Sequence, residues 1–194
     1  VTEDDIDNLA DIIKSDKVQL TFAKYNTAKP VFVECEMPDE DRHAITDALK
    51  ATKFGMPFEH VPTYLTGYYK YKAGTEFSES GKIVQGKHDM FDIYAIFYET
   101  SETVRTLDGT NKFSHPNLVS IARIEDAKET DEWTQFYLPF KTLPGKTVDK
   151  AKLEAGQYNV AIVFSSSIEG DLFNGAVGST LYIDEVELIH SVEE

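Results

Sequence analysis

The sequence predicts an all-β fold: an antiparallel sandwich of the jelly-roll type with a short helical segment at its N-terminal end. After Gly55, apolar and polar residues alternate in one short run after another, and Gly, Pro and Asp residues separate the runs. Helical spacing is almost missing from this part of the chain. Alternation with a period of two indicates half-buried strands, and many short strands joined by turns are typical of sandwiches.

Residues 1–41 are predicted to form an acidic, partly helical leading segment. Thr2 can cap a helix over residues 2–16, in which apolar residues recur at helical spacing. Alternation then predicts two short strands, at residues 18–23 and 31–33.

Residues 42–194 are expected to form the sandwich, because all the strongly alternating runs lie there. The predicted strands are 64–72, 90–98, 118–124, 133–140, 158–166 and 180–189. Their inward residues are predicted to be Leu65, Tyr69, Ile93, Phe97, Phe136, Leu138, Ile162, Phe164, Leu181 and Ile183. The sole tryptophan, Trp133, begins a strand and is expected to pack at an edge of the sandwich.

Charge and cysteine content narrow the function classes. The chain has 19 Lys and Arg against 34 Asp and Glu, a net charge of −15, which argues against binding to nucleic acid or to an anionic membrane. Cys35 is the only cysteine, so no intrachain disulfide forms. No apolar run is long enough to insert into a membrane. No sequence motif requires a cofactor.

Two neighbouring strands are predicted to carry a ligand face. If strands 64–72 and 90–98 pair as antiparallel neighbours, one sheet face presents a mixed set of aromatic and charged side chains. That set is Tyr68, Lys70, Asp92, Tyr94 and Tyr98. Tyr rings suit the CH face of a pyranose, and Lys and Asp supply a donor and an acceptor for its hydroxyls. The alternatives are an ordinary outer sheet face and, for Asp92, a structural hydrogen bond.

Several segments together resemble a known family. They are Lys53–Phe58, Gly67–Gly74, Asp92–Ala95, Trp133–Phe140, Ala161–Ser167 and Phe173–Val186. In this order they resemble the putative carbohydrate metabolism domain of exported proteins from gut anaerobes, over about residues 54–190, whereas residues 1–41 do not. The resemblance implies a jelly roll similar to galactose-binding and carbohydrate-binding modules, often placed behind a lipoprotein signal and an immunoglobulin-like domain.

From this resemblance we expect a non-catalytic module that binds a neutral glycan. The parent protein would be exported, in the periplasm or on the outer-membrane surface of a Gram-negative bacterium, and would contain further domains. The first alternative is a glycoside hydrolase or related sugar-active enzyme on the same sandwich, and the second is a structural or adhesion module that contacts protein. Related sugar-binding jelly rolls often hold a structural calcium ion, for which Asp184 is the candidate ligand.

Overall fold

The computed structural model describes residues 18–22, 31–35, 52–79 and 81–191. The chain divides into two compact units, Val1–Ala51 and Thr52–Glu194. In the first unit, β1 (Val18–Phe22) pairs antiparallel with β2 (Val31–Cys35), where alternation predicts two strands. The helix predicted over residues 2–16 lies outside the described residues.

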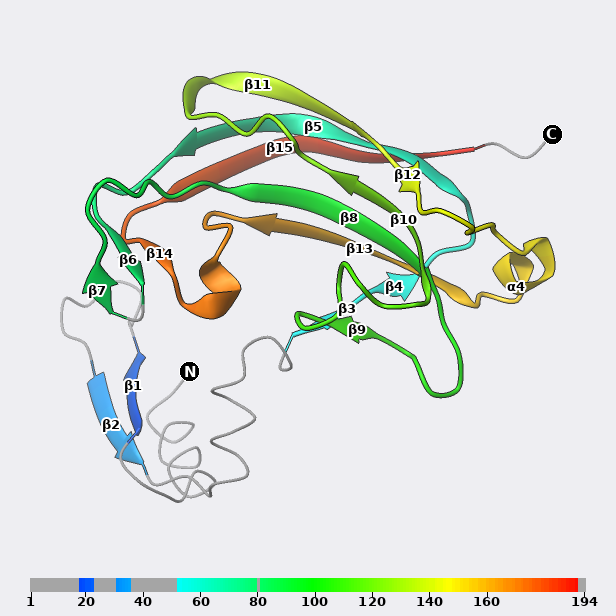
Figure 1. Cartoon of the computed structure of the whole chain (residues 1–194), viewed down its shortest axis with the longest axis horizontal. Coiled ribbons are helices and arrows are strands. Elements are labelled where there is room, and N and C mark those ends of the chain that lie inside the picture. The colour runs from blue at the N-terminus through cyan, green and yellow to red at the C-terminus, as the bar shows by residue number, and fades with distance from the viewer. Residues whose placement is uncertain (1–17, 23–30, 36–51, 80, 192–194) are drawn as a thin grey trace. The chain divides into compact units, whose positions relative to one another are not determined.

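Two antiparallel sheets form the layers of the second unit (Figure 1). The large sheet has the order β12 (Lys141–Thr142), β10 (Leu118–Arg123), β8 (Asp92–Glu99), β13 (Tyr158–Ser165) and β4 (Met56–Pro57). The small sheet has the order β11 (Thr130–Pro139), β5 (Pro62–Lys72) and β15 (Thr180–His190). The predicted antiparallel all-β fold is therefore confirmed, and each long strand lies close to its predicted range.

Short elements complete the second unit. β14 (Gly175–Ala176), β6 (Phe77–Glu79) and β7 (Lys82–Ile83) form one small sheet, and β3 (Lys53–Phe54) pairs with β9 (Leu107–Asp108). Helix α4 (Lys150–Glu154) begins where the Asp149 side chain accepts the Lys152 N–H, at 3.1 Å. None of the helices in the described part of the chain has the length and apolar character to cross a bilayer.

The predicted pairing of the two Tyr-rich strands is wrong. β5 lies between β11 and β15 in the small sheet, whereas β8 lies between β10 and β13 in the large sheet. The connection between them, residues 73–91, contains β6 and β7 and passes from one layer to the other. A hairpin between neighbours needs only a short turn, so the length of this connection favours the crossing.

The main core lies between the two sheets. Its buried members are Leu65, Tyr69, Tyr71, Phe91, Ile93, Ala95, Ala122, Phe136 and Leu138. Most of the predicted core residues are buried, and Ile162, Leu181 and Ile183 pack half-buried against this core. Phe164 is a correction, because 37% of it is exposed. It lies one residue before the end of β13, and a small sheet covers a larger one only in part.

The other face of β8 is also covered. Tyr94, Ile96 and Tyr98 are buried there in a second core with Leu107 and Leu118. β8 is therefore buried on both faces, which accounts for its almost continuous apolar sequence.

Candidate functional site

The structure divides the five predicted ligand residues between two sheets. Tyr68 and Lys70 lie on the outer face of β5, whereas Asp92, Tyr94 and Tyr98 are buried on β8. The prediction that all five share one face is wrong because it required β5 and β8 to be neighbours. Of these five residues, only Tyr68 and Lys70 are partly exposed and can contact a ligand in the folded protein.

Tyr98 holds the second core together instead of facing solvent. Its hydroxyl donates to the Phe54 carbonyl and accepts from Asn159 Nδ2, at 3.1 Å. Asn159 Nδ2 also donates to the Arg105 carbonyl, at 3.0 Å. Burial raises the pKa of the Tyr98 hydroxyl, so it stays protonated and keeps donating at ordinary pH.

Asp92 and Tyr94 belong to a charged cluster at one end of the second core. Arg123, on the neighbouring strand β10, donates from Nε and Nη2 to the two carboxylate oxygens of Asp92, at 3.1 and 2.7 Å. Burial raises the pKa of the Tyr94 hydroxyl, and the carboxylates of Asp92 and Asp171 raise it further. Asp171 in turn accepts from Lys112 Nζ, at 2.6 Å. The structural alternative considered for Asp92 therefore holds, with an arginine as its partner.

The outer face of the small sheet carries an exposed aromatic surface. Trp133, Tyr137 and Tyr182 are 46%, 54% and 56% exposed, respectively. We call this surface the aromatic platform and define it by Tyr68, Lys70, Trp133, Gln135, Tyr137 and Tyr182. Exposed aromatic rings gathered on one face are unusual enough on a soluble protein to indicate a contact surface.

Strand register arranges the platform in rows. In the first row Tyr182 is the Cα partner of Lys70, and Lys70 Nζ lies 4.9 Å from the centroid of the Trp133 ring. In the second row Tyr68 pairs with Gln135 on one side and with Asp184 on the other.

Tyr137 provides the aromatic ring of the third row. It pairs with Thr66 of β5, and its ring lies 4.4 Å from that of Tyr64. Because paired residues in a sheet project to the same side, the rings and polar groups of all three rows share the outer face.

A shallow hollow borders the first row of the platform. Its volume is about 190 Å³, and it is lined by Lys70, Tyr71, Lys72, Thr130, Asp131, Thr180 and Tyr182. The hollow gives one end of the platform more depth and more polar groups than the other.

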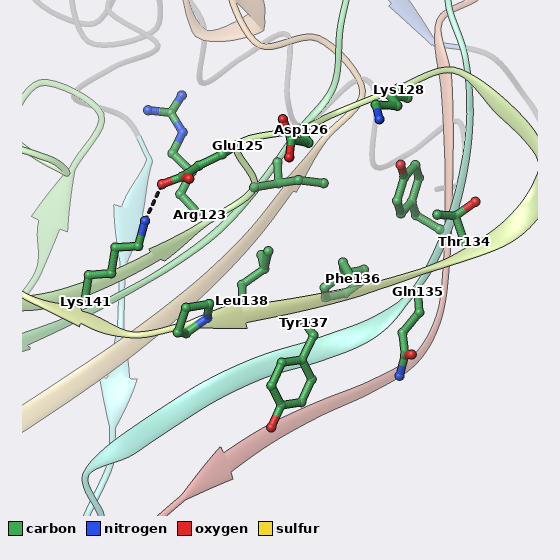
Figure 2. A pocket seen from close by; sticks show the side chains of 13 residues that line it. Arg123, Glu125, Asp126, Lys128, Thr134, Gln135, Phe136, Tyr137, Leu138 and Lys141 are labelled. Carbon is green, nitrogen blue, oxygen red and sulfur yellow. Dashed lines mark hydrogen bonds and ion pairs between the residues drawn. The ribbon is translucent and has the colours of Figure 1, made fainter.

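A larger cleft, of about 360 Å³, opens beside β11 (Figure 2). Phe136 and Leu138 supply apolar lining, and an ion pair between Lys141 and Glu125 lies at its rim. The hydrogen bond from Lys141 lowers the pKa of the Glu125 carboxyl. Figure 2 shows the Tyr137 ring projecting from β11 away from Glu125. Two platform residues, Gln135 and Tyr137, also belong to the lining of this cleft, so the cleft borders the platform.

The comparisons with known proteins fit a carbohydrate-related role. The model of the putative carbohydrate metabolism domain family matches residues 39–189. The chain belongs to this family. The resemblance of the sequence segments to it is thereby confirmed, and no curated protein is significantly similar to the chain.

Two solved structures are similar to this member of the putative carbohydrate metabolism domain family. One is a putative glycoside hydrolase from Bacteroides thetaiotaomicron, with 71% identity, a TM-score of 0.76 and coverage of 78% of this chain and 45% of the other. The second is a putative glycoside hydrolase from Bacteroides vulgatus, with 51% identity, a TM-score of 0.73 and coverage of 76% and 59%. The chain thus spans about half the length of these two proteins.

The calcium prediction for this family member concerns Asp184. The Asp184 carboxylate accepts the N–H of Glu185 at 2.9 Å and lies on an exposed part of β15. Within the described ranges, no group of three or more His, Cys, Asp or Glu side chains could hold a metal ion. Calcium also takes carbonyl and water oxygens as ligands, so the calcium site stays a prediction.

Four platform residues were not among the predicted ligand residues: Trp133, Gln135, Tyr137 and Tyr182. Trp133 does lie on an edge strand, as expected, but its ring faces solvent on the outer side of the small sheet. The alternation of the strand indicates that Tyr137 points outward, because its neighbours Phe136 and Leu138 are both predicted to point inward. What sequence alone does not provide is the neighbour of each strand, and hence which exposed rings come together.

Proposed function

We propose that this domain is a non-catalytic module that binds a neutral glycan on its aromatic platform. The observation that carries the proposal is the gathering of three half-exposed rings, Trp133, Tyr137 and Tyr182, around Lys70 and Gln135 on one sheet face. Membership of the putative carbohydrate metabolism domain family supports a sugar as the ligand.

The chemistry of the platform suits sugar hydroxyls and CH groups. Aromatic faces pack against the apolar side of a pyranose, while Lys70 donates and Gln135 both donates and accepts hydrogen bonds. The net charge of −15 would repel an anionic glycan over a long range, which favours a neutral one. An open sheet face covers only one side of a ligand, so we expect modest affinity.

The proposal includes the setting of the module. The chain spans 45% and 59% of its two solved relatives, so we infer that it works beside other domains of a longer protein. We further propose that this parent is exported to the periplasm or the outer-membrane surface of a Gram-negative bacterium. Both relatives come from Bacteroides species, which supports this setting.

A glycan array followed by calorimetry on the positive glycans tests the function. Trp133→Ala and Tyr182→Ala should each weaken binding at least tenfold, while both proteins keep the wild-type circular dichroism spectrum and melting temperature. Phe173→Ala is the matched control, because Phe173 is 67% exposed on a loop outside the platform. An array without any positive glycan would overturn the proposal, as would platform variants that bind like wild type.

A second candidate function is glycoside hydrolysis, which the description of both solved relatives favours. The cleft beside β11 places the carboxylates of Glu125 and Asp126 at one opening. A glycosidase needs a carboxylic acid with a raised pKa, whereas Lys141 lowers that of Glu125. Hydrolysis of array-positive glycans that is lost in Asp126→Asn would favour the enzyme over the binding module.

A further inference from the structure

We propose that the aromatic platform binds an extended chain of β-1,4-linked pyranoses that lies along β11 and β5 and covers at least three sugar units. This inference rests on the proposed function and adds the class of glycan and its direction on the protein. It is carried by the spacing of the rows, by their polar groups and by their alignment along the strands.

The platform is longer than a single sugar unit. Trp133 and Tyr137 lie four residues apart on β11, which corresponds to about 13 Å at the rise of an extended strand. A single pyranose cannot contact both rings, because the separation exceeds its own length. A chain of several units that runs parallel to the strand contacts them in turn.

A middle row of side chains lies between these two rings. Tyr68 occupies this middle row on β5, with Gln135 and Asp184 as its Cα partners. Successive rows on one face are two residues apart, about 6.6 Å, so each row can serve a different sugar unit. The side chains of Gln135 and Asp184 provide a donor and acceptors for hydroxyls at both edges of the chain.

The three rows follow one another along neighbouring strands. Figure 1 shows β11, β5 and β15 running side by side. A chain that contacts all three rows must extend along the strands for about 13 Å. A ribbon-like β-1,4-linked glycan extends in this way, whereas an α-1,4-linked chain winds into a helix and leaves the line of rows after one or two units.

The hollow gives the platform a strong end and a weak end. Lys70 and Tyr182 belong both to the first row and to the lining of the 190 Å³ hollow, where a sugar unit finds contacts from more than one side. Tyr137 at the other end borders the larger cleft, but its ring projects away from Glu125 (Figure 2) and is 54% exposed. The first sugar units should therefore bind mainly at the row of Trp133, and later units should extend toward Tyr137.

Calorimetry with series of oligosaccharides of increasing length, called ladders below, tests this assignment. We would titrate cello-, xylo- and manno-oligosaccharides of one to six units, with malto-oligosaccharides as the α-1,4-linked comparison. At least one β-1,4 ladder should gain tenfold or more in affinity between one and four units and then level off. A monosaccharide that binds as tightly as its tetramer, or a malto ladder that binds more tightly than every β-1,4 ladder, would overturn the inference.

Variants at the two ends test the direction. Tyr137→Ala should weaken binding of the tetramer several-fold and leave the dimer unchanged, whereas Trp133→Ala should weaken both. Trp133→Phe keeps an aromatic ring and should recover part of the affinity that Trp133→Ala loses. It thereby serves as a control for a folding defect. Equal effects of Tyr137→Ala on dimer and tetramer would contradict the arrangement.

The inference and the proposed function can fail separately. If no β-1,4 ladder binds but other array glycans bind in a Trp133-dependent way, the glycan class is wrong and the binding module stands. If the array shows no glycan at all, both fail.

Discussion

Arg123 holds both carboxylate oxygens of Asp92 across the neighbouring strands β10 and β8, at 3.1 and 2.7 Å. Only 4% of Asp92 is exposed, so water cannot replace this partner easily. Arg123 itself stacks on Phe113, with its guanidinium carbon 4.5 Å from the ring centroid. A buried carboxylate is tolerated at the start of the apolar strand β8 because the neighbouring strand supplies its counter-charge.

Removing the arginine should therefore destabilise the fold. We expect Arg123→Met to lower the free energy of unfolding by about 1–3 kcal/mol, because it leaves the Asp92 carboxylate without its partner. Denaturant unfolding measures this change, and Lys82→Met, at an exposed position on β7, is the control. The double variant Asp92→Asn/Arg123→Met should recover part of the loss. If it is as unstable as the sum of the single variants, the pair does not act as a unit.

Alanine substitutions at two glycines distinguish the stability cost of a steric clash from that of backbone strain. Gly55 has φ +117°, and a Cβ there would lie 2.1 Å from the Tyr98 hydroxyl oxygen. Gly86 has φ +79°, with no heavy atom within 4 Å of such a Cβ. Gly86→Ala should cost about 1–2 kcal/mol of unfolding free energy from the left-handed backbone alone.

Gly55→Ala should cost more than Gly86→Ala, about 2–5 kcal/mol, because overpacking against the fixed Tyr98 hydroxyl adds to the strain. Urea unfolding of both variants under identical conditions provides the comparison. Equal losses would show that Tyr98 can move away from Gly55.

Phe97 and Phe164 should differ strongly although both lie on long strands of the large sheet. Phe97 is fully buried between Val119 and Tyr158, whereas 37% of Phe164 is exposed. Phe97→Ala should cost about 3–5 kcal/mol, and Phe164→Ala about 1 kcal/mol, because a partly open site leaves no closed cavity. The denaturant midpoints of the two variants measure these losses of stability. A larger loss for Phe164→Ala than for Phe97→Ala would contradict the partly exposed position of Phe164 on β13.

The ion pair between Glu169 and Lys87 should give the 3-10 helix (Gly170–Leu172) a specific acid dependence. The hydrogen bonds from Lys87 and from Asn174 lower the pKa of the Glu169 carboxyl from its ordinary value of 4.5. Stability from this carboxylate is therefore full above about pH 4.5 and is lost as the pH falls through the lower, folded-state pKa.

Melting temperatures between pH 2 and 7 test this dependence. Glu169→Gln should melt below wild type at pH 7, and the two curves should converge at the acid end, because the wild-type carboxyl is then also uncharged. Lys87 works in the opposite direction, since Glu169 raises its pKa above 10.5, and its contribution persists until strongly alkaline pH. A gap between the curves that stays constant with pH would assign the effect to packing.

The fold was predictable from the sequence to a greater extent than the site. Alternation located the long strands, and most of the predicted inward residues are buried, because a period of two depends only on which side of one strand is covered. The site depended on which strands are neighbours. That information lies in the 73–91 connection and in long-range packing, which local patterns do not encode. Tyr68 and Lys70 are therefore on an exposed face as predicted, but beside Trp133 and Tyr182 rather than Asp92 and Tyr94.

Because β8 is buried on both faces, it couples the unfolding of the two cores. The strand contributes Ile93 and Phe97 to one side and Tyr94 and Tyr98 to the other, so neither core can open while β8 stays in place. Its amide protons should exchange with solvent only when the whole second unit unfolds, and should be the slowest in the chain. The aromatic platform on the small sheet and the Asp92–Arg123 ion pair of the large sheet therefore belong to one cooperative unit, and a destabilising substitution in either core lowers the stability of both.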